Sequence, residues 1–374
     1  MVKRIIILIG ILTFTFFITI NIFNKKSTTT IDGNKYAISV NGVKQNKFPD
    51  MGNYDVSISC ENATGTWDYA NWRLEVNNIT SNSANCNISF NSASAKTKLN
   101  DKIKSLNNQT VGNGKVINEN GYRYEGKNPN NYILFNGELW RIIGTFDENN
   151  DGNYLTKIIR NEALGSYAWT TGYNNNWSSS WLNTLLNNYY YNNEDYYSSC
   201  YYSAMGPRSD TKVSHNCYFE SKGIGINDIY RNFIEKTKWY LKSKNDTVDD
   251  INTSYNNERN GDLPSNGVGE INTYIGLMYL SDIGYSILAS DCSRTNTSWR
   301  YDINCVQNSW LIKYSPEWIL TWMTSDIVIR VANDTVGFAT PKISGVIRPT
   351  VYLKSNVYVV SGDGSYNNPY VIGI

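Results

Sequence analysis

The side chains that could do chemistry in this 374-residue chain are few and scattered. The only histidine is His215, beside Cys217, and a loop position is its simplest interpretation. A single histidine excludes two-histidine zinc sites and the H-E-x-x-H proteases. The nucleophile motif G-x-S-x-G and the phosphate loop G-x-x-x-x-G-K-[ST] are both missing. The sequence therefore predicts no catalytic residue, no metal site and no cofactor.

Carboxylates leave one enzymatic reading open. A glycosidase needs two acids whose separation is set by the fold and not by sequence spacing, so an enzyme acting on glycan stays an alternative. The run 147–152 resembles the start of a calcium loop, but Ile158 stands at its twelfth position, where a glutamate is required. A hairpin turn is therefore favoured there.

Aromatic residues make up 14% of the chain and crowd the segment from Trp169 to Tyr202. Flat rings beside amide groups such as those of 174–176 suit a sugar or an extended peptide. The alternative is that these rings fill the core of a chain that is short of leucine and valine. The candidate binding residues are Trp169, Tyr173, Trp177 and Trp181.

Charge argues against one class of partner. The chain has 34 Lys+Arg and 33 Asp+Glu, a net charge of +1, and only 18% charged residues. A protein that neutralises phosphates needs a basic excess, so no nucleic-acid partner is predicted.

Residues 5–23 form an uncharged apolar run of about 19 residues, close to the roughly 20 needed to cross a bilayer as a helix. No small-x-small cleavage site follows it, so we expect an uncleaved transmembrane anchor over 1–26 and a polar tether over 27–35. A cleaved signal peptide is the alternative. The predicted partner of residues 5–23 is the membrane.

The cysteines indicate which side of the membrane holds the rest of the chain. All of them follow the anchor, and they form three pairs that are local in sequence: Cys60, Cys86, Cys200, Cys217, Cys292 and Cys305. An even count without close metal spacing is typical of disulfides in an oxidising exterior. We expect a single-pass cell-membrane protein with an extracellular C-terminal bulk. Six cysteines allow 15 connectivities, and buried free thiols are the alternative.

Alternation of apolar and polar residues predicts strands at 36–40, 54–58, 72–76 and 86–90. We expect a small β-sandwich over 36–91, a linker over 92–114 and a larger domain over 115–374. In that domain Asn136-Gly137 predicts a hairpin turn.

Helical spacing in the larger domain predicts helices over 178–190 and 226–241. With strands before and after them, the fold class expected is a β-rich α+β fold.

The larger domain resembles a family of bacterial cell-surface proteins with a domain of unknown function. The resemblance rests on several runs in order along 115–374: Glu138-Leu139-Trp140-Arg141-Ile142-Ile143-Gly144, Lys157-Ile158-Ile159-Arg160, Asn176-Trp177-Ser178, Gly345-Val346-Ile347-Arg348-Pro349-Thr350 and Gly362-Asp363-Gly364-Ser365-Tyr366-Asn367-Asn368-Pro369-Tyr370. That family is similar, more distantly, to the C-type-lectin-like fold of the formylglycine-generating enzymes. The resemblance implies a C-type-lectin-like scaffold. It implies no catalytic residue, because the enzymes' reactive cysteines have no counterpart in 345–353.

These observations together predict a membrane-anchored surface protein that acts as a non-catalytic binding or adhesion module for a glycan or peptide. The alternatives are an enzyme acting on cell-wall or extracellular glycan and a structural component of the envelope.

Overall fold

The computed structural model describes residues 35–374 except 53, 70–71, 82, 93–95, 171, 198–216, 245–248, 265–266, 325 and 333–334. The expected anchor (1–26) and all but the last residue of the tether (27–35) lie outside the described residues, as do Cys200 and His215. The chain divides into two units, of which one comprises the residues up to Thr97 with Ile372–Ile374 and the other comprises Lys98–Val371.

The fold is β-rich, with 41% of residues in strands and 15% in helices, which confirms the expected β-rich α+β class. None of the described helices has the length and hydropathy needed to cross a membrane.

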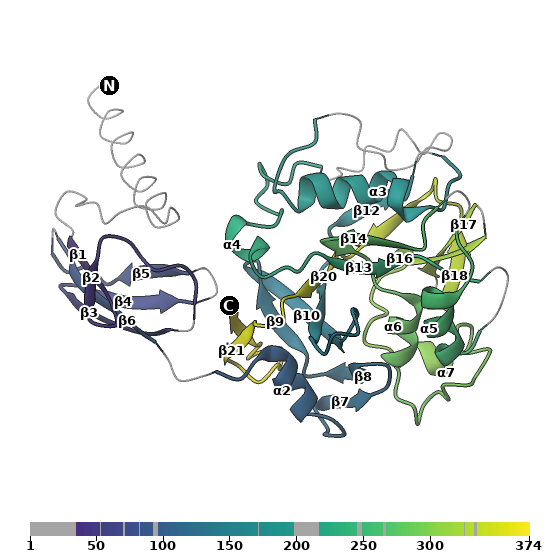
Figure 1. The fold of residues 1–374 in the computed structure, drawn as a ribbon, viewed down its shortest axis with the longest axis horizontal. Helices are drawn as coiled ribbons and strands as arrows, with labels where there is room; N and C mark the ends of the chain where they lie inside the picture. The colour runs from purple at the N-terminus through teal and green to yellow at the C-terminus, as the bar shows by residue number, and fades with distance from the viewer. Residues whose placement is uncertain are drawn as a thin grey trace. The chain divides into compact units, whose positions relative to one another are not determined.

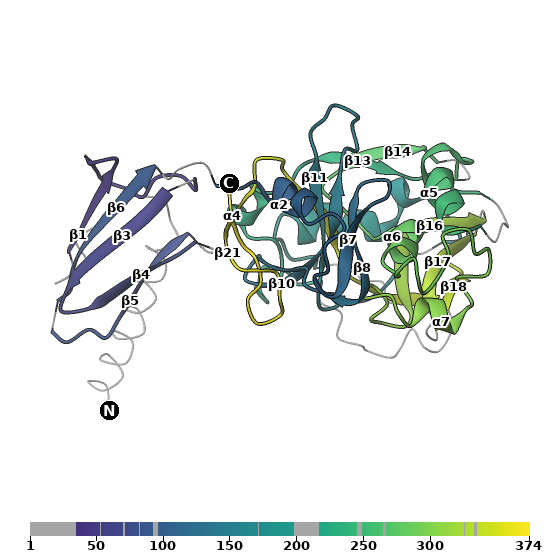
Figure 2. The ribbon, with the colours of Figure 1, turned by 90° about the horizontal axis from the view of Figure 1, so that it is seen from below.

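The first unit is a four-stranded sheet, in the order β2-β1-β6-β3, with a β4–β5 hairpin against one face (Figure 2). Alternation is the cause: in β6 the side chains of Cys86, Ile88 and Phe90 are buried, and those between them are more exposed. Rings from the hairpin pack on Phe90, with Trp67 at 4.9 Å between centroids. The strands are β1 (Lys35–Val40), β2 (Val43–Gln45), β3 (Tyr54–Glu61), β4 (Thr64–Asp68), β5 (Arg73–Asn77) and β6 (Asn85–Ser92).

Two of the expected disulfides are present. Cys60 and Cys86 face each other across β3 and β6 and are bonded, and Cys292 is bonded to Cys305. Cys217 is also disulfide-bonded. The sequence-local pairing is therefore confirmed for two of the three pairs.

The second unit contains a seven-stranded sheet in the order β15-β20-β11-β10-β8-β7, with β9 paired to β10 (Figure 1). Its centre is the antiparallel β10–β11 pair, whose Trp140, Ile142 and Ile158 are fully buried. The strands are β7 (Gly112–Asn118), β8 (Tyr122–Pro129), β9 (Tyr132–Phe135), β10 (Glu138–Phe146), β11 (Leu155–Arg160), β15 (Ile275–Gly276) and β20 (Thr350–Leu353).

A five-stranded sheet in the order β12-β19-β16-β17-β18 forms the other half of this unit. Its strands are β12 (Gly165–Ala168), β16 (Glu317–Thr324), β17 (Ile327–Ala332), β18 (Thr335–Ala339) and β19 (Ser344–Ile347). A further pair in this unit is β13 (Thr237–Tyr240) with β14 (Glu270–Thr273). The last two strands of the chain are β21 (Tyr358–Ser361) and β22 (Val371–Gly373).

The helices are short and lie around these sheets, with α5, α6 and α7 gathered beside β16–β18 (Figure 1). They are α2 (Leu99–Ser105), the 3-10 turn η1 (Trp177–Ser179), α3 (Trp181–Thr184), the π-helix η2 (Leu185–Tyr190), α4 (Asp228–Arg231), α5 (Ile251–Asn260), α6 (Leu280–Tyr285) and α7 (Ile303–Val306). Helix α2 falls within the expected linker over 92–114 and belongs to the second unit.

The hairpin expected at Asn136-Gly137 is confirmed, since these two residues join β9 to β10. Both have positive φ, 57° and 76°, which a two-residue turn of this kind requires and which asparagine and glycine tolerate.

The helix expected over 226–241 is wrong beyond its first turn. Helix α4 ends at Arg231, and the chain then forms strand β13, paired with β14. The reason is a change of period, because Thr237, Trp239 and Leu241 are buried while the residues between them are not. The helix expected over 178–190 is present as the succession of η1, α3 and η2, and Ser180 caps α3.

We predict that replacing both Cys60 and Cys86 by serine lowers the stability of the first unit by about 3 kcal/mol, because the bond closes a loop of 26 residues. Native-state hydrogen exchange on the full-length chain measures this through amides of β3 and β6. Amides of β10 and β11 serve as the internal reference and should keep their protection. Equal loss of protection in both sets would contradict the prediction.

Candidate functional site

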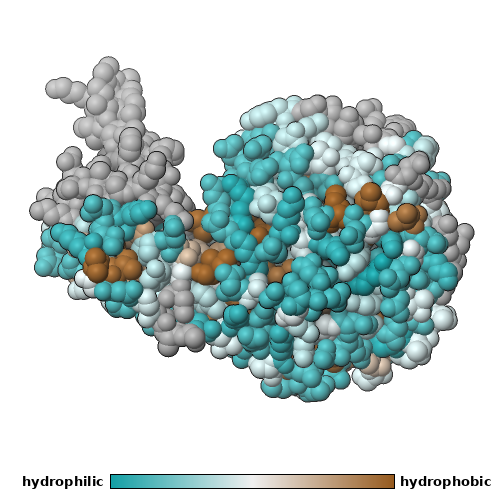
Figure 3. All heavy atoms as spheres, in the orientation of Figure 1, coloured by the Kyte–Doolittle hydropathy of each residue, from teal (hydrophilic) through white to brown (hydrophobic). Residues whose placement is uncertain are grey.

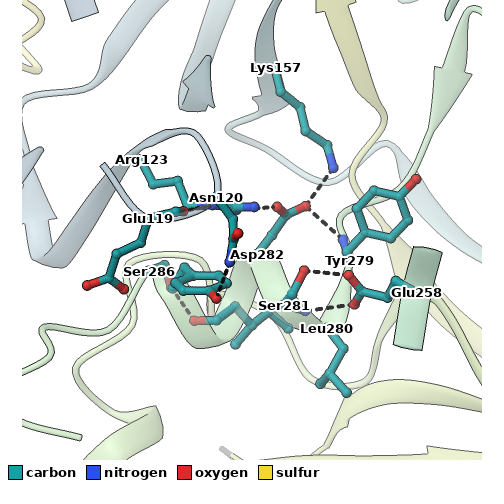
Figure 4. A network of polar contacts seen from close by, with 12 residues as sticks. Glu119, Asn120, Arg123, Lys157, Glu258, Tyr279, Leu280, Ser281, Asp282 and Ser286 are labelled. Carbon is teal, nitrogen blue, oxygen red and sulfur yellow. Dashed lines mark hydrogen bonds and ion pairs between the residues drawn. The ribbon is translucent and has the colours of Figure 1, made fainter. Parts of the chain in front are cut away.

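The second unit gathers polar side chains in two places, and the first is its interior. Asp282 of α6 accepts hydrogen bonds from Arg123 (2.9 Å) and Lys157 (2.6 Å), and also from the backbone N–H of Tyr279 (Figure 4). The three charged side chains are at most 3% exposed. They join strands β8 and β11 to helix α6.

A second buried acid lies beside this group. Glu258 of α5 accepts from the N–H and the hydroxyl of Ser281, so it ties α5 to α6 (Figure 4). Glu148 likewise accepts from Tyr352 (2.7 Å) and from Arg259 (3.2 Å). Each of these acids is bonded to other groups of the protein.

Burial and nearby positive charges shift the pKa values of these buried acids in opposite directions. Burial raises the pKa of Asp282, but the positive charges of Lys157 and Arg123 outweigh it and hold that pKa below its usual value. Burial raises the pKa of Glu258 above its usual value, in spite of the nearby charge of Arg259. Because these groups are buried and bonded to one another, we assign them to the stability of the fold.

The second place is a surface groove of about 370 Å³, called here the Arg141 groove. Segments far apart in the sequence meet in it: β8, β9, β10, the residues after β11, the chain after α7 and the C-terminal loop. Its lining residues are Lys127, Tyr132, Arg141, Asn161, Glu162, Gln307, Ser309, Trp310, Ile312, Lys313 and Tyr366.

Arg141 lies between two aromatic rings, with its guanidinium carbon 4.2 Å from the ring centre of Tyr132 and 4.5 Å from that of Trp310. Its Nε donates to Asn131 Oδ1 at 2.7 Å, and its Nη2 donates to Asn128 Oδ1 and to the carbonyl of Pro129. The two rings and the hydrogen bonds together hold the guanidinium in one orientation.

The Arg141 groove carries a positive balance. Three basic residues line it, Lys127, Arg141 and Lys313, against one acid, Glu162. Glu162 accepts from Lys313 at 2.6 Å and from the hydroxyl of Tyr314. Burial raises the pKa of Glu162, but these bonds outweigh it, so the pKa is lowered and the carboxylate stays ionised.

The C-terminal loop brings an exposed ring to this groove. Gly364 has φ of 80°, and a Cβ there would lie 2.6 Å from the carbonyl of Asn130, so only glycine allows the loop to approach so closely. The N–H of Tyr132 then donates to Gly364 O. Tyr366, 61% exposed, makes an edge-to-face contact with Tyr132 at 5.4 Å. From the sequence alone, the run 362–370 indicated only a family resemblance and no part of a site.

The candidate aromatic residues named from the sequence lie elsewhere. Trp169 and Trp177 are buried and pack on each other at 5.0 Å between ring centres, as in the core-filling alternative. Tyr173 is 53% exposed, with the Lys342 ammonium 3.3 Å from its ring centre. Trp181 is half-buried against Tyr196. None of the four lines the Arg141 groove.

The face of the second unit seen in Figure 3 is mostly hydrophilic, with small separate apolar spots. A broad apolar docking surface is not visible on that face, so polar recognition is the more natural chemistry there.

No protein-family model, no curated protein and no solved structure matches this chain.

We predict that Asp282→Asn lowers the free energy of unfolding by about 3–5 kcal/mol, because Arg123 and Lys157 would be left buried without a carboxylate. Chemical denaturation of the full-length chain checks this. The matched control is Asp228→Asn, which breaks an exposed ion pair with Arg231 and should leave stability nearly unchanged.

The pH dependence of stability should also change in this variant. Because the pKa of Asp282 is lowered in the folded state, its contribution is present above its unfolded pKa of about 3.9 and is lost as the pH falls through the folded pKa. The wild-type protein should therefore lose more stability on acidification below about pH 4 than Asp282→Asn does. Parallel curves would contradict the assignment.

Proposed function

We propose that this chain is a membrane-anchored, extracytoplasmic surface protein that binds an extracellular ligand in the Arg141 groove without catalysing a reaction. The observation that carries the proposal is the composition of that groove. An exposed tyrosine, a guanidinium between two rings and side-chain amides meet on one concave surface, and such convergent polar groups are typical of a ligand site.

A binding role fits the groove better than glycan hydrolysis. A glycosidase needs two carboxyl groups on either side of the bond it cleaves. The groove lining contributes one acid, Glu162, and its carboxylate is held by Lys313 and Tyr314.

The cellular location is proposed from the cysteines and the N-terminal run. The Cys60–Cys86 and Cys292–Cys305 bonds fit an oxidising compartment. Residues 5–23, uncharged and apolar, are the proposed anchor.

The finer fold assignment is a proposal as well. A C-type-lectin-like scaffold is supported by the early Trp-Arg strand β10 and the late strand β20, which both pair with β11 in one sheet. The hairpin and sheet of the first unit, with rings between them, support a small β-sandwich.

Glycan and peptide arrays probed with the full-length protein test the binding role. We expect retention on a subset of the array, and we expect Tyr366→Ala to weaken it about fivefold, since an aromatic contact contributes about 1 kcal/mol. The matched control is Tyr173→Ala, which removes another exposed ring, 53% exposed and outside the groove lining, and should bind as the wild type does.

Two results would count against the proposal. Failure of the full-length protein to be retained on either array would remove the binding role. Loss of binding in Tyr173→Ala with full binding in Tyr366→Ala would move the site to the segment around Tyr173.

A further inference from the structure

Arg141 differs from four other buried arginines in what neutralises its charge. Those four form ion pairs with carboxylates, and they are Arg123, Arg160, Arg294 and Arg348. Arg141 is 7% exposed, and within the described part of the chain it has no ion pair with a carboxylate. A buried charge without a counter-charge is costly.

The acceptors that Arg141 does have are neutral. They are the side-chain amide oxygens of Asn131 and Asn128 and the backbone carbonyl of Pro129. They occupy Nε and Nη2, whereas Nη1 has no hydrogen bond to any residue that the structure describes. The guanidinium is thus oriented and only partly satisfied, and its residue lines the groove.

The acid of the same groove does not fill this role. Glu162 accepts from Asn161 and Lys313 on one carboxylate oxygen and from Tyr314 on the other. Both oxygens therefore have donors other than Arg141.

We infer that the Arg141 groove binds a saccharide that carries an acidic group, with its carboxylate or phosphate against the Arg141 guanidinium. This rests on the proposed function and names the class of ligand. A charge-assisted bond to Nη1 completes the hydrogen bonding of the guanidinium and supplies the missing counter-charge. Lys127, exposed on the groove wall, adds a second positive charge.

The rest of the lining favours a sugar over a peptide. The exposed ring of Tyr366 offers a flat surface for a pyranose, and Gln307 offers an amide to hydroxyl groups. Ile312 is the one aliphatic residue of the lining, so the groove offers little to an apolar peptide side chain.

The pKa of Arg141 is consistent with an anionic ligand in the groove. Burial lowers the pKa of Arg141 to about 10, against an opposing effect of Tyr132 and with a smaller contribution from the positive charge of Arg348. The charged guanidinium is therefore disfavoured where it lies, and an anion bound beside it restores the balance. Ligand binding should accordingly raise the melting temperature of the protein.

Binding of the full-length protein to matched probes tests the inference. The probes are tetragalacturonic acid, the same tetrasaccharide with its carboxyl groups reduced to alcohols, pentamannose 6-phosphate, its dephosphorylated form and a tetraglutamate peptide. We expect at least one acidic saccharide to bind tenfold or more tightly than its neutral counterpart. Which of the two acidic saccharides binds distinguishes a carboxylate from a phosphate ligand.

Two substitutions test the role of Arg141. Arg141→Gln should lower the affinity for the acidic saccharide at least tenfold, to that of the neutral one. Asn128→Asp should do the same without removing Arg141, because it places a carboxylate on an exposed residue 3.3 Å from Nη2. The matched control is Lys236→Gln, which removes one positive charge from an exposed site outside the groove and should bind as the wild type does.

The outcomes separate the inference from the proposed function. Equal affinity for acidic and neutral saccharides, or unchanged binding in both Arg141→Gln and Asn128→Asp, would overturn the inference that Arg141 binds an acidic group of the ligand. The proposed binding role would still stand. Tighter binding of the tetraglutamate peptide than of the saccharides would overturn the inference that the ligand is a saccharide. The proposed binding role would again stand. Failure to bind every probe would overturn the inference, and the binding role falls with it only if the full arrays are blank too.

Discussion

A carboxylate that meets two cations away from water constrains how the second unit is assembled. Asp282 accepts from Arg123 and from Lys157, which come from β8 and β11, and it also holds the start of its own helix through the N–H of Tyr279. Buried ions are stable only when their partners are in place. The strands and α6 must therefore be in register with one another before any of these charges is satisfied.

This constraint reaches the surface through β10, which lies between β11 and β8 in the sheet. Its residues alternate in role: Trp140 and Ile142 are in the core, whereas Arg141 lies between the rings of Tyr132 and Trp310. A strand that is fixed from both sides gives the guanidinium a fixed position. A rigid strand positions a binding group more accurately than a loop does.

Local patterns were sufficient for part of the fold. Alternation identified β1, β3, β5 and β6, and Asn136-Gly137 identified a hairpin, because each signal depends on neighbours along the chain. The helical reading of 226–241 failed because pairing with β14 outweighed the apparent helical spacing. The groove was missed for a related reason, since Arg141 and Tyr366 are brought together by tertiary structure, and the aromatic crowding that the sequence displays is partly core.

The acceptors around Arg141 are neutral, although a charged acceptor would fit there. An aspartate at the position of Asn128 would be close enough to neutralise the guanidinium from within the chain, as Asp282 neutralises Arg123. An amide at that position accepts a hydrogen bond and so orients the group, but it contributes no charge. The buried charge of Asp282 is neutralised by Arg123 and Lys157 of the same chain. No carboxylate among the described residues neutralises Arg141 in this way. A fold that orients a cation with neutral groups beside a groove leaves its counter-charge to be supplied by a ligand.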